Sequence, residues 1–300
     1  MKILLAGSNG QLAQELQPIL LSSGEVIAVD RTRLDLSQPE SIRQAIAEIQ
    51  PDLVVNSGAY TAVDKAESEP ELAYAVNGIA PGILAEECEK LGSTLIHIST
   101  DYVFDGSQGS PYQETDSTNP LGIYGKSKLA GEEAIRQAGN RHMIIRTAWV
   151  YGNYGKGNFV KTMLRLGKDR EEIRVVADQI GSPTWTGDLA EAISQIIPQI
   201  KPEIFGTYQY TNSGVCSWYD FAIAIFEEAE KLGFPLKVQR VIPITTSEYP
   251  TPAKRPAFSV LSSVKISGIL GTHPPYWRQG LRQMLLREVK SIPVAPSGDC

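Results

Sequence analysis

Residues 1–13, which read MKILLAGSNGQLA, join an apolar run to a glycine-containing turn and then to the start of an amphipathic segment. The run predicts a strand over Ile3–Ala6, and the segment predicts a helix over Gln11–Leu21. Glycine at positions 7 and 10 permits a tight turn and lets the backbone approach a pyrophosphate, while the helix start offers unpaired N–H groups. The turn therefore predicts a dinucleotide site. An ordinary strand–helix turn is the alternative, because the spacing is G-x-x-G-x-x-A rather than G-x-G-x-x-G.

The same alternation of apolar and amphipathic segments continues through the first half of the chain. Continuous apolar runs of strand length are typical of parallel strands buried on both faces. They are Ile3–Ala6, Val26–Val29, Leu53–Val55, Leu95–Ile98 and Met143–Ile145, and the helices expected around them are Gln11–Leu21, Pro39–Ile49, Pro70–Leu91 and Pro120–Ala138. This alternation predicts an α/β fold with a doubly wound, Rossmann-like parallel sheet.

The chain is less regular beyond Trp149. Helices are expected at Gly187–Ile197 and Trp218–Lys231, and a long ordered loop at Ile242–Pro256. We therefore expect a dinucleotide-binding domain over residues 1–150, completed by later segments. A smaller, irregular α/β part over 151–292 would mainly bind substrate, and residues 293–300 are expected to be disordered.

Composition excludes several classes of protein. The 300 residues are 42% apolar and 21% charged, which is typical of a globular protein, and the net charge is −6 with no long basic block, which argues against a nucleic-acid partner. No run approaches the ~20 apolar residues that cross a bilayer, so no membrane partner is expected. The three cysteines lack metal-ligand spacing, which indicates a reduced, cytoplasmic protein.

The choice of cofactor depends on two residues that follow the second expected strand. Asp30 stands where an acidic side chain commonly accepts a hydrogen bond from the adenosine ribose, which favours NAD. Arg31 follows it, and a guanidinium there suits the 2′-phosphate of NADP. Both cofactors stay open on these residues alone.

A tyrosine and a lysine define the expected catalytic centre. Tyr124 and Lys128 are four residues apart on an expected helix and so share a face. A nearby ammonium favours the phenolate, so we expect Lys128 to lower the pKa of Tyr124 and make it a workable acid–base. Thr100 follows the expected strand Leu95–Ile98, at the edge of the sheet where ligands bind, and its hydroxyl would orient a substrate carbonyl. Simple turn-forming and packing roles are the alternative for each residue taken singly.

Several longer motifs identify a relationship. The chain resembles the extended short-chain dehydrogenase/reductases and, within them, the dTDP-4-dehydrorhamnose reductase family. The resemblance rests on Gly7–Leu12 (GSNGQL), Asn56–Asp64 (NSGAYTAVD), Ser99–Gly106 (STDYVFDG), Tyr124–Lys128 (YGKSK), Arg146–Gly152 (RTAWVYG) and Lys254–Pro256 (KRP) with Ser259 and Leu261. Two departures are small: Ala13 stands where many relatives have glycine, and Gly58 where alanine is usual.

The resemblance implies reduction of the C4 ketone of dTDP-4-dehydro-L-rhamnose to dTDP-L-rhamnose by NADPH, with NADH as the other cofactor. Tyr124 would donate the proton, with Thr100 and Lys128 completing the catalytic set. The residues expected to bind the cofactor are Gly7, Asn9, Gly10, Gln11, Leu12, Asp30, Arg31, Asp35, Leu36, Ala59, Tyr60, Thr61, Tyr124 and Lys128. Thr100, Asp101, Trp149, Lys254 and Arg255 are expected to bind the dTDP-sugar, the basic pair clamping its diphosphate.

Alternatives remain at this stage. Some relatives dimerise around Mg²⁺ held by glutamates, and Glu15 matches one such ligand, so a homodimer and Mg²⁺ stay open while no metal site is assigned. A sugar-nucleotide epimerase or dehydratase would use the same fold. A non-catalytic NADP-binding regulatory subunit resembling that of methionine adenosyltransferase would also keep it. The three histidines are widely separated, so core or surface roles are expected for them.

Overall fold

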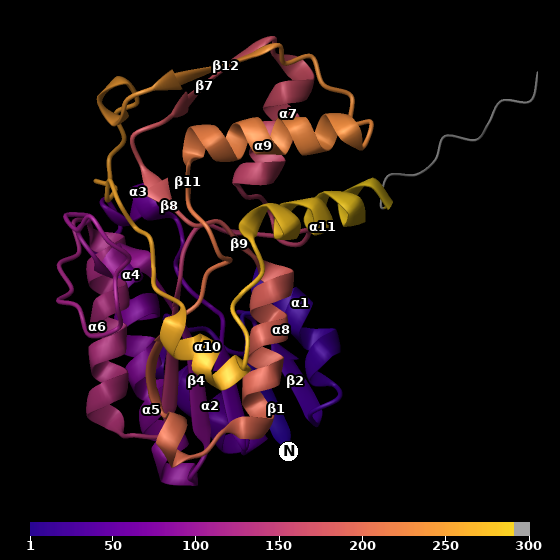
Figure 1. Ribbon diagram of the computed structural model, residues 1–300. Coiled ribbons are helices and arrows are strands. Elements are labelled where there is room, and N and C mark those ends of the chain that lie inside the picture. The colour runs from indigo at the N-terminus through magenta and orange to yellow at the C-terminus, as the bar shows by residue number, and fades with distance from the viewer. Residues whose placement is uncertain (291–300) are drawn as a thin grey trace, which may run out of the picture.

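The computed structural model describes residues 1–290 and contains a six-stranded parallel sheet with helices on both faces (Figure 1). The strand order is β10-β5-β4-β3-β1-β2. The strands are β1 (Lys2–Ala6), β2 (Glu25–Val29), β3 (Leu53–Asn56), β4 (Thr94–Thr100), β5 (His142–Thr147) and β10 (Gly206–Gln209). The first five contain the apolar runs of the sequence, so the doubly wound α/β fold is confirmed. The expected disorder of 293–300 concerns residues outside the described part of the chain.

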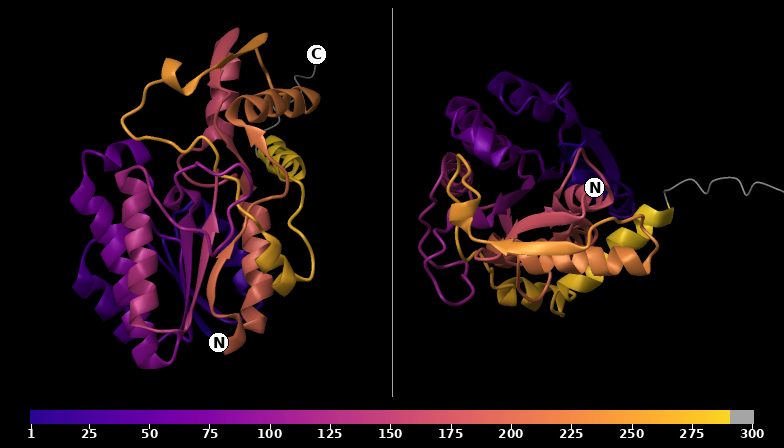
Figure 2. Two further views of the ribbon diagram at one scale, coloured as in Figure 1. Left: turned by 60° about the vertical axis from the view of Figure 1, so that its left-hand side comes forward. Right: turned by 90° about the horizontal axis from the view of Figure 1, so that it is seen from above.

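Helices cover the two faces of the sheet in separate layers (Figure 2). One layer contains α1 (Gln11–Leu20) and α8 (Thr186–Ile196), which pack on each other and on the inner side chains of β1, β3 and β5. The other contains α2 (Pro39–Ile49), α5 (Ala80–Leu91) and α6 (Ile123–Ala138). Burial of apolar side chains on both faces explains why the strands are apolar throughout.

The sixth strand comes from the second half of the chain. β10 pairs in parallel with β5, with Gly206 opposite Met143 and Gln209 opposite Arg146. The sequence did not predict this strand, since only four residues form it and two of them are polar. The sheet that carries the expected dinucleotide site is therefore completed from residues beyond 200.

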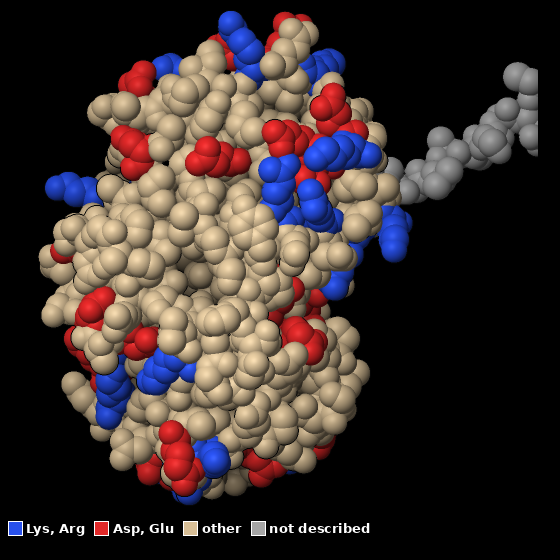
Figure 3. All heavy atoms as spheres, in the orientation of Figure 1, with Lys and Arg blue, Asp and Glu red and all other residues tan. Residues whose placement is uncertain are grey.

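Above the carboxyl edge of the sheet lies a smaller part with its own core. It contains α7 (Phe159–Asp169), α9 (Trp218–Lys231) and α11 (Trp277–Lys290), with the strand pair β7 (Glu172–Val176) and β12 (Arg240–Ile244). Charged side chains gather over α9 and α11 (Figure 3), where Arg278 and Arg282 pair with Glu228. Two short strand pairs also belong to this part: β6 (Val150–Tyr151) pairs with β9 (Thr184–Trp185), and β8 (Ile180–Gly181) pairs with β11 (Cys216–Ser217). Tyr151, Trp185 and Cys216 contribute side chains to its core.

Several boundaries differ from the sequence predictions. The expected helix over residues 70–91 is interrupted: α4 (Pro70–Tyr74) and α5 are joined by a π-turn over Ala75–Ile79. The turn brings the buried Asn77 side chain to Tyr60, where it accepts from the backbone N–H and donates to the carbonyl. Helix α6 begins at Ile123 rather than at Pro120, after the N-cap Gly122.

Two more segments complete the description. The expected loop over residues 242–256 begins inside strand β12, because Ile242 and Ile244 pair with β7 before the chain leaves the sheet. A further short helix, α3 (Val63–Ala66), follows β3, and α10 (Val264–Leu270) packs on β10 and α8. Among residues 1–290, no helix is both long enough and apolar enough to cross a membrane.

Candidate active site

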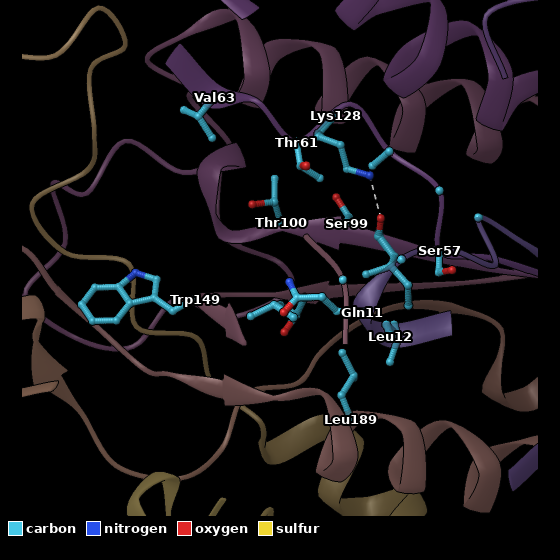
Figure 4. Close-up of a pocket in the computed structure, with 18 of the residues that line it drawn as sticks. Gln11, Leu12, Ser57, Thr61, Val63, Ser99, Thr100, Lys128, Trp149 and Leu189 are labelled. Carbon is cyan, nitrogen blue, oxygen red and sulfur yellow. Dashed lines mark hydrogen bonds between the residues drawn. The ribbon is translucent and has the colours of Figure 1, made fainter. Parts of the chain in front are cut away.

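A cavity of about 700 Å³ lies at the carboxyl ends of β1, β3, β4 and β5, under the smaller part of the molecule (Figure 4). It brings together most of the residues that the sequence singled out. Those lining it are Gly7, Asn9, Gly10, Gln11, Leu12, Asp30, Arg31, Ala59, Thr61, Thr100, Asp101, Tyr124, Lys128 and Trp149. The carboxyl edge of an open parallel sheet is where ligands bind in such folds.

The turn between β1 and α1 is shaped for close approach. Gly7 has φ +82°, a left-handed conformation, and a Cβ there would lie 2.8 Å from both Cα and N of Gly58. The N–H groups of Gly7 and Ser8 both donate to the carbonyl of Val29, at 3.0 Å each, so β2 fixes the turn. No side chain caps the first turn of α1. This uncapped helix start at the cavity wall suits a phosphate group.

The acidic residue after β2 is ionised at neutral pH. Hydrogen bonds from the Thr32 side chain and backbone lower the pKa of Asp30, and Asn9 lies 3.4 Å from its second oxygen. Arg31 is 74% exposed and pairs with Asp35 at 3.2 Å. A carboxylate and a guanidinium thus stand side by side at the rim of the cavity.

Three of the residues expected to bind cofactor lie outside the cavity lining. Asp35 accepts from the backbone and side chain of Ser37. Leu36 packs over Gly58, where a Cβ would lie 2.7 Å from its Cδ1, which explains why glycine replaces the usual alanine at that position. Tyr60 turns its hydroxyl to Glu69, to which it donates at 2.8 Å.

Thr100 and Asp101 stand at the end of β4, beside Tyr124 of α6. The Thr100 hydroxyl donates to Asp101 Oδ1 at 3.0 Å and accepts from the N–H of Tyr102 at 3.2 Å. Burial raises the pKa of Asp101 to about 6, and its Oδ2 has no hydrogen-bond partner within residues 1–290. Burial also raises the pKa of Tyr124 to about 12, with a hydrogen bond to Thr100 opposing the rise. The phenol therefore carries its proton at neutral pH.

Lys128 faces β4 rather than the tyrosine. Its Nζ donates to the carbonyl of Ile98 at 2.6 Å (Figure 4) and lies 3.2 Å from His97 Nε2. Burial lowers the pKa of Lys128 to about 8, with Glu132 opposing the change. The expected lowering of the Tyr124 pKa by Lys128 is not what the structure has, since the pKa of the phenol is raised by burial and the ammonium is held by β4 atoms.

Two stacked indoles form the opposite wall. Trp149 has φ +48°, and its ring stacks on that of Trp218 with centroids 3.6 Å apart and planes 9° from parallel. Both rings line the cavity. A Cβ on Gly181 would lie 2.5 Å from the Trp149 indole, so the backbone holds the ring from behind. Left-handed backbone in a bulky residue is costly and concentrates at functional sites. The sequence pointed to Trp149 but did not distinguish Trp218 from other aromatics.

The basic pair expected to clamp a diphosphate does not line the cavity. Arg255 forms an ion pair with Asp64 at 2.8 Å, and Lys254 is exposed. A different cation is present: Lys156, flanked by Gly155 and Gly157, contributes to the lining and forms no ion pair with any residue of the described chain. Position 156 follows the RTAWVYG motif, and a lysine between two glycines was the signal that sequence reasoning missed.

The loop that carries Lys156 is attached to the phosphate turn. Asn158 donates to the side chain of Gln11 at 2.7 Å and to the carbonyl of Gly152 at 2.8 Å. A Cβ on Gly155, which has φ +78°, would lie 2.6 Å from Gln11 Cγ. The loop thus lies directly against the start of α1.

The Mg²⁺ alternative finds no support in the structure. Glu15, the candidate ligand, pairs with Arg287 at 2.9 Å. Within residues 1–290, no group of three or more His, Cys, Asp or Glu side chains is arranged to hold a metal ion.

Comparisons with known proteins agree with the motifs. The model of the family described as RmlD substrate binding domain matches residues 1–290. A dTDP-4-dehydrorhamnose reductase of Escherichia coli K12 is 44% identical over 292 residues, covering 95% of this chain and 97% of the relative. A crystal structure of a reductase of that name from Clostridium acetobutylicum superposes with TM-score 0.89 at 41% identity, covering 96% of this chain and 99% of the other. One from Bacillus anthracis, in complex with NADP, superposes with TM-score 0.88 at 40% identity, covering 96% and 100%.

Proposed function

The chain belongs to the RmlD substrate binding domain family, and on that premise we propose that it is an NADPH-dependent dTDP-4-dehydrorhamnose reductase. It reduces the C4 ketone of dTDP-4-dehydro-L-rhamnose to dTDP-L-rhamnose. The observation that carries the proposal is one cavity that joins a phosphate-binding turn to Thr100, Tyr124 and Lys128 in a chain 44% identical to such a reductase.

The walls of the cavity fit a dinucleotide. The close contact of Gly7 with Gly58 leaves backbone, without side chains, facing the uncapped start of α1, where a pyrophosphate is held by N–H groups. Asp30 would accept from the adenosine ribose, and the neighbouring Arg31 would meet the 2′-phosphate that distinguishes NADPH from NADH. When bound, the cofactor supplies the hydride for C4.

Tyr124 supplies the proton. With a pKa raised to about 12 by burial, its phenol stays protonated at neutral pH, which is the form that reduction of a ketone consumes. Thr100 would orient the carbonyl by turning its hydroxyl hydrogen from Asp101 Oδ1 to the ketone oxygen. As the proton leaves, the phenolate must be stabilised in a buried place, and Lys128, one helical turn away, is the cation for that task. The stacked Trp149 and Trp218 form the wall against which the sugar lies.

The neighbourhood of Thr100 favours reduction over the chemistry of a dehydratase. A dehydratase needs an acid and a base beside the threonine. Here Asp101 is the one carboxyl next to it in sequence, and one of its oxygens is taken by Thr100 itself. The cytoplasmic location and the homodimer stay predictions.

The test measures oxidation of NADPH with dTDP-4-dehydrorhamnose generated in place. We expect one NADPH oxidised per ketone consumed, and we expect Tyr124→Phe to keep NADPH binding while losing nearly all turnover. Tyr102→Phe is the matched control, because Tyr102 stacks edge-on against Tyr124 at 5.4 Å without carrying the transferred proton. Turnover without net NADPH oxidation would instead indicate an epimerase or dehydratase. NADPH binding without any turnover in the unaltered chain would indicate the regulatory subunit.

A further inference from the structure

Three buried side chains from neighbouring elements form a line that ends at the active-site lysine. Asn56 is the last residue of β3, His97 lies in the middle of β4, and Lys128 lies on α6. Asn56 and His97 are 0% exposed and Lys128 is 1% exposed. The Asn56 Nδ2 and His97 Nδ1 atoms are 3.1 Å apart, and His97 Nε2 is 3.2 Å from Lys128 Nζ. The sequence predicted a core or surface role for His97, and it pointed to Asn56 only as the first residue of the NSGAYTAVD motif.

The orientation of the Asn56 amide fixes the proton on the imidazole. The N–H of Gly58 donates to Asn56 Oδ1 at 3.2 Å, so the oxygen is on that side and Nδ2 faces His97. An amide nitrogen only donates, so His97 Nδ1 must accept and carries no proton. A neutral imidazole then has its single hydrogen on Nε2, pointing at Lys128. Burial keeps the pKa of His97 well below its usual 6.5, which excludes the doubly protonated ring at neutral pH.

That hydrogen places a donor in front of the lysine nitrogen. An ammonium group has three donors and no acceptor, so it repels the Nε2–H, whereas the neutral amine has a lone pair that accepts it. The amine can meanwhile donate to the Ile98 carbonyl, 2.6 Å away. The geometry therefore destabilises the ammonium form of Lys128 relative to the neutral amine, in the same direction as burial, which lowers the pKa of Lys128 to about 8.

The other charged groups around Lys128 do not reverse this preference. Glu132, one turn further along α6, favours the ammonium, but its carboxylate is shared by Ser99 of β4, Arg146 of β5 and Arg136. On the cavity side, Tyr124 is a neutral phenol at pH 7, and the carboxyl of Asp101, which follows β4, is bonded to Thr100.

We propose that His97, oriented by Asn56, is a positioning residue that holds the Lys128 nitrogen against Ile98 and thereby sets the pH at which ketone reduction fails on the alkaline side. The inference rests on the proposed function, in which the Lys128 ammonium stabilises the phenolate that Tyr124 becomes when its proton leaves. A donor that favours the neutral amine makes the ammonium disappear at a lower pH. Removing that donor must therefore move the alkaline limit of activity upward.

Enzyme kinetics test this through two substitutions of the same residue. His97→Phe keeps a ring but removes both nitrogens, so the alkaline limb of kcat/KM should move up by about one pH unit, the size expected from losing one hydrogen bond to a single protonation state. His97→Gln keeps an acceptor for Asn56 and a donor for Lys128, so its limb should return towards that of the unaltered chain. His142→Gln is the control, because this buried histidine of β5 bonds to Gly139 away from the site. An unmoved limb in His97→Phe overturns the proposal.

A measurement without catalysis covers the case in which His97→Phe does not fold. Nitrogen-15 NMR of the unaltered chain distinguishes the imidazole tautomers, and His97→Gln assigns the signal. The proposal expects an imidazole that carries its hydrogen on Nε2 and does not titrate between about pH 6 and 9, the range around neutrality in which an ordinary histidine changes charge. An Nδ1–H tautomer or a titrating ring refutes it. If the chain oxidises no NADPH at all, the proposed function fails, while the tautomer still tests the line of side chains.

Discussion

Glu132→Gln tests the buried ion pair beneath the active site. Glu132 is 0% exposed, and its two oxygens accept from Ser99, from Arg136 and twice from Arg146, with donor–acceptor distances of 2.6–2.9 Å. Arg146 is 2% exposed, and within residues 1–290 it has no other carboxylate partner. The amide keeps the shape of the side chain but leaves the guanidinium charge buried without compensation.

The expected loss is about 3–5 kcal/mol in the free energy of unfolding, the usual cost of breaking a buried pair from one side. At about 2 °C per kcal/mol for a chain of this size, the melting temperature should fall by about 6–10 °C. Urea denaturation followed by circular dichroism measures the first quantity, and calorimetry the second. Arg136→Gln is the matched control: this partner is 38% exposed, so its loss should cost under about 1 kcal/mol.

The pH dependence of the difference identifies its cause. Burial alone would raise the pKa of Glu132, but its bonds and the charge of Arg146 outweigh burial and hold it below the usual 4.5. A depressed pKa stabilises the fold above the unfolded-state value and loses that effect as the pH falls through the folded-state value. The gap between the unaltered chain and Glu132→Gln should thus be full at pH 7 and shrink below pH 4.5. A gap under about 1 kcal/mol at pH 7, or one that stays constant on acidification, would refute this reasoning.

Three further outcomes are expected. Gly7→Ala should weaken NADPH binding at least about tenfold in a fluorescence titration, because φ +82° and the 2.8 Å approach to Gly58 leave no room for a Cβ. An unchanged affinity would contradict the assignment of this turn to the pyrophosphate. Lys156→Ala should raise KM for NADPH and for NADH alike, because the lysine charge would meet the pyrophosphate that both cofactors share. Arg31→Ala should raise KM for NADPH only, because NADH has no 2′-phosphate. If both variants raised both KM values equally, Arg31 would not be the residue that recognises the 2′-phosphate. Because Glu15 is paired with Arg287 rather than free to bind a metal ion, adding EDTA should leave the turnover rate unchanged. A rate that falls with EDTA and is restored only by Mg²⁺ would disprove this expectation.

The part of the fold that sequence predicts is the part governed by local pattern. Five strands are continuous apolar runs because both of their faces are buried, and Pro39 and Pro70 mark true helix starts since the first turn needs no N–H there. The π-turn between α4 and α5 is hidden from such reasoning. Gly78 within it and Pro81 just after it weaken a continuous helix, but neither specifies a π-turn, and the contact of the Asn77 side chain with the Tyr60 backbone joins segments 17 residues apart.

The same distinction holds for the candidate site. The turn at Gly7, the Asp30 position and the pair Tyr124 and Lys128 follow from spacing within single elements. The partner of Arg255 does not, because Asp64 is 191 residues away in the chain and only the fold brings the two together. Spacing also could not show that Lys128 points at His97. The position of Lys128 on the helix gives the direction of its side chain but does not identify the group on β4 that the side chain contacts.

The late arrival of β10 has a consequence for synthesis on the ribosome. Every residue of β5 is buried in the finished molecule, and its outer edge is covered by β10, which is synthesised only after α7 and α8. Until then the nascent chain exposes an unpaired apolar edge, the kind that recruits strands from other chains. A gene cut after residue 150 would make that exposure permanent, so the amino-terminal half expressed by itself should accumulate in inclusion bodies.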